Sequence, residues 1–154
     1  MSDTEQIFLR CDLAPDEAAH RLAHSLGLDL KVDGSDAVLS RPASAGRPGR
    51  VGGPLRINQY ADPSGDPDDV SVLDGYDLVW EMWYTRHDDP VQRDEVRLLF
   101  EKVAARMPWP ALLLTNLDLL LAAFDPATGV RWFPEGTTPD LEHRALWSDY
   151  AIDR

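Results

Sequence analysis

Apolar and polar residues alternate along several stretches of the chain, and a period of two is typical of half-buried β-strands. In residues 7–13 this alternation places Cys11 on the apolar face. In residues 76–86 it places Trp80 and Trp83 on opposite faces of one strand. Alternation or short apolar runs predict further strands at residues 28–32, 37–41, 55–60, 111–114, 118–124 and 130–133.

Two other segments carry apolar residues at the three- and four-residue spacing of an amphipathic helix. The first helix is predicted to begin at Pro15, with Asp16 and Glu17 at the positive end of its dipole, and to end at Gly27. The second covers residues 90–107. The two apolar stripes are Ala19, Leu22, Ala23 and Leu26 in the first helix, and Val96, Leu99, Phe100, Val103 and Met107 in the second.

The order of strand, helix and several strands occurs twice, which suggests two β-α-β-β-type halves. Because strands that follow one another in a run usually pair antiparallel, the sequence predicts an α+β domain. Its antiparallel sheet would carry the two amphipathic helices on one face. The apolar run 117–124 is ambiguous, since it could also form a short helix capped by Thr115 or Asn116. Segments rich in Gly, Pro and polar residues predict mobile loops near 42–54 and 61–75.

Length and charge narrow the class of protein. A chain of 154 residues suits a single domain, residues 1–154. The net charge of −12 disfavours binding to a nucleic-acid backbone and would steer a basic partner. No apolar run approaches the roughly 20 residues that a membrane span needs. A polar, acidic N-terminus without the features of an export signal and a single cysteine favour a cytoplasmic location.

Residues 60–84 combine negative charge with aromatic side chains. They hold six aspartates and one glutamate but no lysine or arginine, and they end in two tryptophans and a tyrosine. Such a stretch could be a metal or acid/base site, a surface for a basic protein, or a solvated loop beside a core strand. Exposed aromatic residues beside charged ones are typical of interaction hot spots. Alternatively, a C-terminal tail with Trp147 and Tyr150 covers the second sheet face.

Two groups of residues could in principle bind a metal ion. His20 and His24 lie four residues apart on a predicted helix and could chelate zinc, but the glutamate of a metalloprotease helix is missing. A calcium site would draw on a group of aspartates that is irregularly spaced, is interrupted by prolines and lacks the downstream glutamate. These aspartates are Asp62, Asp66, Asp68 and Asp69.

Other chemistry has little support. Cys11 lies on an apolar strand face, where cysteine behaves as a small hydrophobic residue, and no histidine is placed beside it. No phosphate-binding loop, nucleophile elbow or dinucleotide fingerprint occurs. A group of arginines without nearby acids in the sequence could touch nucleic acid but lacks interleaved aromatic residues. The group is Arg41, Arg47, Arg50 and Arg56.

The second half of the chain reads "LVWEMWYTRHDDPVQRDEVRLLFEKVAARMPWPALLLTNLDLLLAAFDPATGVRWFP", with "LEHRALW" after it. It resembles the bacterial immunity proteins of the swarming-inhibition toxin type. The opening "IFLRCDLAPDEAAHRLAHSLGL" is similar to the first strand and helix of that family. The resemblance implies a non-enzymatic protein that neutralises one cognate toxin by tight binding. The arginine-rich and aspartate-rich segments have no counterpart in it, and partner specificity could lie there.

We therefore expect a non-enzymatic immunity protein that binds a basic protein toxin, with no catalytic residue, cofactor, metal, nucleic acid or membrane. The alternative is a small metal-dependent enzyme that uses His20, His24 or the aspartates, or a regulatory binding module of unknown ligand. The residues predicted to contact the partner are Asp66, Asp68, Asp69, Asp74 and Glu81 for charge, and Trp83 and Tyr84 as aromatic anchors.

Overall fold

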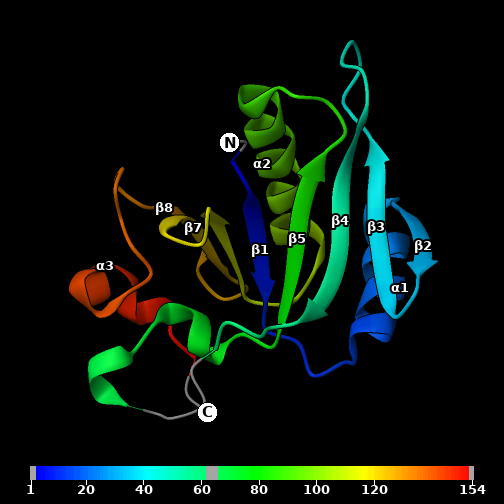
Figure 1. Ribbon diagram of the computed structural model, residues 1–154. Coiled ribbons are helices and arrows are strands. Elements are labelled where there is room, and N and C mark those ends of the chain that lie inside the picture. The colour runs from blue at the N-terminus through cyan, green and yellow to red at the C-terminus, as the bar shows by residue number, and fades with distance from the viewer. Residues whose placement is uncertain (1–2, 62–65, 153–154) are drawn as a thin grey trace.

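The computed structural model describes residues 3–61 and 66–152. Within them, eight strands form one antiparallel sheet in the order β2-β3-β4-β5-β1-β6-β7-β8 (Figure 1). The strands are β1 (Glu5–Leu9), β2 (Asp29–Asp33), β3 (Asp36–Pro42), β4 (Arg50–Ile57), β5 (Leu78–Tyr84), β6 (Ala111–Thr115), β7 (Leu119–Asp125) and β8 (Gly129–Trp132). The helices are α1 (Pro15–Leu26), α2 (Asp89–Arg106) and α3 (Arg144–Trp147), with the short 3-10 helices η1 (Pro67–Asp69), η2 (Val72–Gly75), η3 (Leu141–His143) and η4 (Ser148–Tyr150). The predicted α+β class is confirmed.

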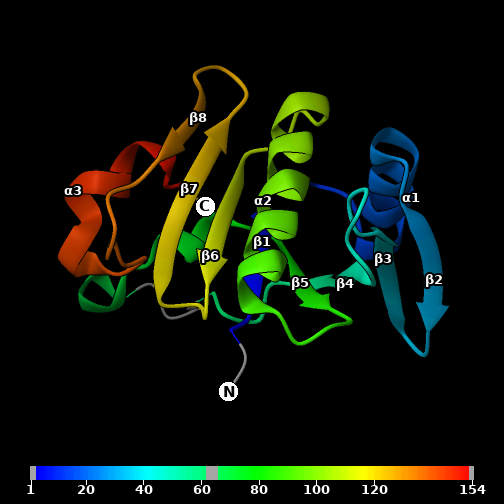
Figure 2. The same ribbon diagram turned by 90° about the horizontal axis from the view of Figure 1, so that it is seen from above.

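The two long helices lie on the same face of the sheet (Figure 2). α1 packs over β2, β3 and β4, and α2 packs over β1, β4, β5 and β6. Each helix connects two parallel strands, α1 from β1 to β2 and α2 from β5 to β6. β1 and β5 are antiparallel, and the two crossovers run in opposite directions across the sheet. Strand direction and crossover direction are thus both reversed between the two connections. Two crossovers with the same, right-handed sense, which crossovers favour, therefore place both helices on one face of the sheet.

Both helices begin and end where the sequence predicts. α1 begins at Pro15 and ends where Gly27 adopts a left-handed conformation, with φ of 68°. Before α2, the Asp88 carboxylate accepts a hydrogen bond from the Val91 N–H at 3.1 Å. This bond satisfies an N–H group that the first turn would otherwise leave unpaired. The predicted apolar stripes are buried against the sheet, with Leu22, Leu99, Phe100 and Val103 fully inaccessible.

In the described part of the chain, the opposite face of the sheet is covered over one half only. Residues 66–76 and the C-terminal segment pack together over this half, where Trp147 is fully buried and donates from its indole N–H to the Asp140 carbonyl at 3.0 Å. Figure 1 looks onto this face, and there β3 and β4 have no helix in front of them. The buried cluster of the covered half is Phe8, Val72, Leu73, Tyr76, Val79, Leu112, Leu114, Leu120, Ala123 and Trp147, and it contains no residue of β2, β3 or β4.

The prediction of a mobile loop near 42–54 is wrong for residues 50–54, because β4 begins at Arg50 and pairs with both β3 and β5. Gly52 and Gly53 allow β4 to pair closely with both neighbouring strands. A Cβ on Gly52 would collide with the backbone of β3, and one on Gly53 would collide with the backbone of β5. The Gly53 carbonyl also accepts the indole N–H of the buried Trp80 at 3.0 Å. The two glycines therefore allow close strand pairing.

The remaining connection between β3 and β4, residues 43–49, is bonded to α2 through Glu95, which has no exposed surface. The Ser44 N–H and hydroxyl both donate to the Glu95 carboxylate, the hydroxyl at 2.7 Å. Arg41 and Arg47 lie 3.6 and 3.5 Å from the same carboxylate. Burial alone would raise the pKa of Glu95, but these hydrogen bonds and positive charges outweigh it and hold the pKa below its ordinary value.

The ambiguous run 117–124 forms a strand, β7, and not a helix. Asn116 and Leu117 have positive φ angles of 54° and 61°, so the chain turns back sharply there and pairs β7 with β6. The two halves do share the order of one strand, one helix and three strands. However, among the three strands that follow each helix, β4 is nearest the sheet centre in the first half, whereas β6 is nearest in the second. No helix in the described parts of the chain is both long and apolar enough to cross a bilayer.

Candidate protein-binding surface

The structure separates the residues predicted to contact a partner into three environments. The four aspartates lie in residues 66–76, beside the C-terminal segment on the covered half of the sheet. Glu81 and Trp83 lie on β5 and point to the same side of the sheet as Val79, next to the uncovered half. Tyr84 points to the helix-covered face, where it is only 9% exposed and its hydroxyl donates to the Pro48 carbonyl. The prediction of Tyr84 as an exposed anchor is wrong, because consecutive strand residues face opposite sides.

Two of the four aspartates hold the covering segment in shape. Asp66 accepts a hydrogen bond from the Asp68 N–H at 2.9 Å and so begins η1. Asp74 accepts from the Ser71 N–H at 3.0 Å, while the Ser71 hydroxyl accepts from the Leu73 N–H at 3.2 Å. This reciprocal arrangement is a capping box around η2. Asp66, Asp68 and Asp69 are exposed to solvent, and Asp62 lies outside the described residues.

A short apolar strip occupies the middle of the uncovered half. Val38 faces Pro54 across the β3–β4 ladder, and Gly52 faces Trp83 across the β4–β5 ladder. The side chains of Val38, Pro54 and Trp83 are all partly exposed. Gly52, the cross-strand neighbour of Trp83 on β4, has no side chain to pack against the indole ring.

Polar side chains border this strip on one side and are bonded to one another. The Tyr60 hydroxyl donates to the Glu81 carboxylate at 2.7 Å, and Arg56 lies 3.7 Å from the same carboxylate. Arg56 also donates to Asp36 at 2.8 Å. This hydrogen bond lowers the pKa of Asp36, while partial burial and the bond to Glu81 raise the pKa of Tyr60. The border thus runs from β3 across β4 to β5 as one connected network.

A second border lies on the other side of the strip. Arg50 donates to the Ser40 hydroxyl at 3.1 Å and forms an ion pair with Asp29. Together the strip and its two borders have an apolar centre and a polar rim, which is the usual anatomy of a protein interface. We call this set of residues the Trp83 surface: Asp29, Asp36, Val38, Ser40, Arg50, Pro54, Arg56, Tyr60, Glu81 and Trp83.

The Trp83 surface is close to electrically neutral. Its borders contain three acids and two arginines, and each of these five side chains takes part in at least one ion pair. The acids that surround the tryptophans in the sequence are therefore not gathered around Trp83 in space. Most of the net charge of −12 lies elsewhere on the molecule.

The arginine group that could have touched nucleic acid is also paired within the chain. Arg41 and Arg47 contact Glu95, Arg50 contacts Asp29, and Arg56 contacts Asp36. A guanidinium already bonded to a carboxylate has fewer donors left for a phosphate. These contacts explain why a segment rich in arginine lies within a protein of strongly negative charge.

The candidate residues for metal binding and nucleophilic chemistry lie apart. His20 and His24 are both exposed on α1. In residues 3–61 and 66–152, no group of three or more His, Cys, Asp or Glu side chains is placed to hold a metal ion. Cys11 is buried, as its position on an apolar face predicts, and burial raises the pKa of its thiol.

Most of the Trp83 surface could not be found from the sequence pattern. Its residues come from β2, β3, β4 and β5, and only the pairing register brings Val38, Pro54 and Trp83 together. The odd spacing of Trp80 and Trp83 was the available indication that one indole would lie on the second face. Comparisons of the chain with protein-family models, with curated proteins and with solved structures found no match.

Proposed function

We propose that this protein acts by binding another protein, as an immunity protein that neutralises a cognate toxin, and that the Trp83 surface is where the partner docks. The proposal depends mainly on one observation: a partly exposed tryptophan on β5 lies beside a sheet half that no buried cluster of the described residues covers. Tryptophan is strongly enriched among the residues that dominate binding energy at protein interfaces. The resemblance of the sequence to toxin-immunity proteins supports the same class of function.

The state of the border residues favours binding over catalysis. A general base or nucleophile needs a group whose pKa suits proton transfer and whose lone pair can reach a substrate. Here Glu81 is engaged by Tyr60 and Arg56, and Asp36 is held by Arg56 with a lowered pKa. Such mutually bonded side chains form a rigid rim around an apolar centre, which suits recognition by shape.

The partner we propose is a basic protein. A net charge of −12 creates a negative potential that accelerates the approach of a positively charged molecule. Because the Trp83 surface itself is close to neutral, this long-range field would act on the association rate. Desolvation of the Trp83 ring would instead act on the dissociation rate.

The product of the gene adjacent to this one is the candidate toxin to test, because an immunity gene is expected beside its toxin gene. Co-expression should restore growth to cells that make the toxin, and the two purified proteins should bind. Trp83→Ala should weaken binding by about 30-fold or more, mostly through faster dissociation. The matched control is Trp132→Ala, which removes an indole that is 40% exposed on the helix-covered face.

Two results would contradict the proposal. If the adjacent gene encodes no toxin, or the toxin neither binds nor is neutralised, the immunity function is wrong. If Trp83→Ala and Trp132→Ala weaken binding equally, the docking surface is wrong although the function stands. The association rate should fall as salt rises from about 50 to 500 mM. A rate independent of salt would reject the electrostatic part alone.

A further inference from the structure

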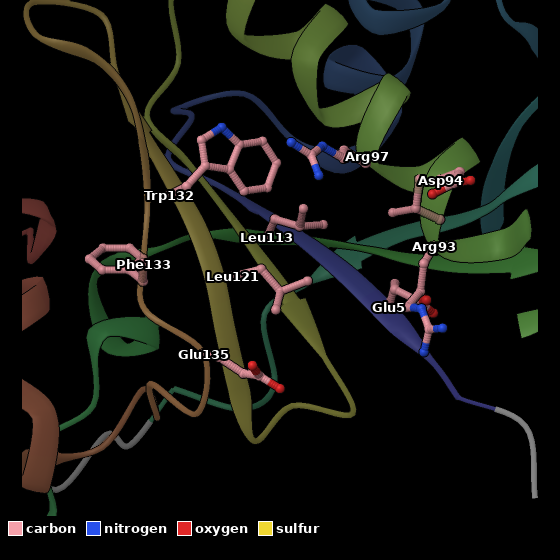
Figure 3. Close-up of a pocket in the computed structure, with 10 residues that line it drawn as sticks. Glu5, Arg93, Asp94, Arg97, Leu113, Leu121, Trp132, Phe133 and Glu135 are labelled. Atoms are coloured by element: carbon pink, nitrogen blue, oxygen red, sulfur yellow. The ribbon is translucent and has the colours of Figure 1, made fainter. Parts of the chain in front are cut away.

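A cavity of about 370 Å³ lies on the other, helix-covered face, between the first half of α2 and strands β6, β7 and β8 (Figure 3). α2 covers the centre of the sheet but does not reach its outer edge, so the space beside the helix stays unfilled. Cavities of a few hundred Å³ with mostly apolar walls and a few polar groups are typical of small-molecule sites. The apolar lining is Val96, Leu113, Leu121, Trp132 and Phe133.

A buried carboxylate with an unmatched oxygen lines this cavity. Glu5 is 1% exposed, and its Oε2 accepts a hydrogen bond from the Gln92 amide at 2.6 Å. Its Oε1 is buried and has no hydrogen-bond partner among the described residues. The Oγ1 of Thr115, directly opposite Glu5 in the β1–β6 ladder, is buried and unmatched as well. Leaving such groups without partners destabilises the fold, and more so for a charged group than for a neutral one.

The charges around Glu5 do not supply the missing donor. Burial raises the pKa of Glu5, the Gln92 hydrogen bond and Arg93 oppose this rise, and Asp3 and Asp89 add to it. Arg93 lines the cavity but bonds to Asp3 at 3.2 Å. A carboxylate oxygen accepts hydrogen bonds and cannot donate when ionised. The group that would satisfy Oε1 is therefore a donor, and a protonated amine would match its charge as well.

A second polar group lies at the edge of the cavity beside Trp132. The Arg97 guanidinium stacks over the Trp132 ring at 4.1 Å from the ring centre and remains about half exposed. Its contact with Glu101 is a surface pair at 3.4 Å, a type worth little energy. Figure 3 shows Glu5 and Arg97 at different edges of the cavity, with Leu113 and Leu121 on the sheet side. The cavity thus offers an acceptor at one edge, a cation at another and an apolar floor.

We propose that this cavity binds a small zwitterionic ligand whose ammonium and carboxylate groups lie at the two ends of a short carbon chain, as in an ω-amino acid. Its ammonium group would bond to Glu5 Oε1, its carboxylate would face Arg97, and its carbon chain would lie on Leu113 and Leu121. The other two acids of the lining do not compete for these roles. Asp94 bonds to Arg47 at 3.2 Å, and Glu135 lies exposed at the rim. The site lies on the opposite face from the Trp83 surface, so either proposal can fail alone.

The test is a matched series of ligands titrated into the full chain by calorimetry. The probes are 5-aminopentanoate and its shorter and longer ω-amino-acid homologues, pentylamine, which lacks the carboxylate, and pentanoate, which lacks the amine. At least one zwitterion should bind saturably, and the compounds with a single charge should bind at least tenfold more weakly, because each lost charged contact costs about 1.4 kcal/mol or more. Equal binding of pentylamine or pentanoate would overturn the zwitterion assignment.

Substitutions in the cavity test whether its residues bind the ligand. Glu5→Gln keeps the side-chain shape and removes the charge, and it should weaken the best zwitterion at least tenfold without lowering the melting temperature. Leu121→Trp should abolish binding by filling the cavity. The control is Glu81→Gln, the same change on the opposite face, which should leave the affinity unchanged. If no probe binds at up to about 10 mM, or if Glu5→Gln binds as well as wild type, the cavity holds only water and the proposal is wrong.

Discussion

The covered and uncovered halves of the second sheet face belong to one continuous sheet, yet they differ in the residues that point outward. On the covered half, Phe8, Leu112 and Leu114 are apolar and have no exposed surface. On the uncovered half, Asp36, Ser40 and Arg56 occupy equivalent outward positions and are bonded to neighbours. A mostly apolar half must be sealed by the chain itself, whereas a half with paired polar groups remains stable in water. The second half is therefore free to present the partly exposed Trp83.

The largest effect should come from Trp147, which seals the covered half. Trp147→Ala would leave a cavity in the buried cluster and remove the indole hydrogen bond to the Asp140 carbonyl, so the free energy of unfolding should fall by about 3–5 kcal/mol. Urea denaturation followed by circular dichroism measures this change. A loss below about 1 kcal/mol would mean that the C-terminal segment does not seal this half.

Trp83→Ala also removes an indole, but from beside the uncovered half, and it should have little effect on stability. Because the ring is partly exposed and its cross-strand neighbour is Gly52, the free energy of unfolding should change by less than about 1 kcal/mol. The same denaturation experiment serves, with Trp147→Ala measured beside it. A loss as large as that of Trp147→Ala would assign Trp83 to the core and remove it as a binding residue.

The smallest effect concerns the polar border. The folded pKa of Asp36 is depressed, chiefly by its hydrogen bond from Arg56, so this pair stabilises the fold above the ordinary aspartate pKa of about 3.9. That contribution is lost as the pH falls through the folded value. Arg56→Gln should raise the pKa of Asp36 towards its ordinary value, as carboxyl shifts in an NMR titration would show. An unchanged pKa of Asp36 in the variant would contradict the pairing.

The helices and the faces of β5 could be predicted from the sequence because both depend on local periodicity. The stripe that contains Val96 and Leu99 has helical spacing, and the odd spacing of Trp80 and Trp83 places the two rings on opposite faces. The composition of residues 42–54 misled the prediction, since glycine and proline usually indicate loops. Here glycine is needed for close pairing of strands, a property that only the neighbouring strands reveal.

The candidate site was less predictable than the fold. The aspartates of residues 66–74 are close to Trp83 in sequence, but the chain leaves the sheet between β4 and β5, and there Asp66 and Asp74 cap short helices. The partners of Trp83 come instead from β3 and β4, through the pairing register. Glu5 gave no sequence indication of a cavity, because its burial depends on α2 and on β6.

Oxidative footprinting of the tryptophans, with the protein free and bound to the proposed toxin partner, tests the central claim most directly. The account predicts that modification of Trp83 falls several-fold in the complex, while modification of Trp132 on the other face is unchanged. Protection of Trp132 with Trp83 still fully reactive would contradict it, and would move the partner to the helix-covered side of the sheet.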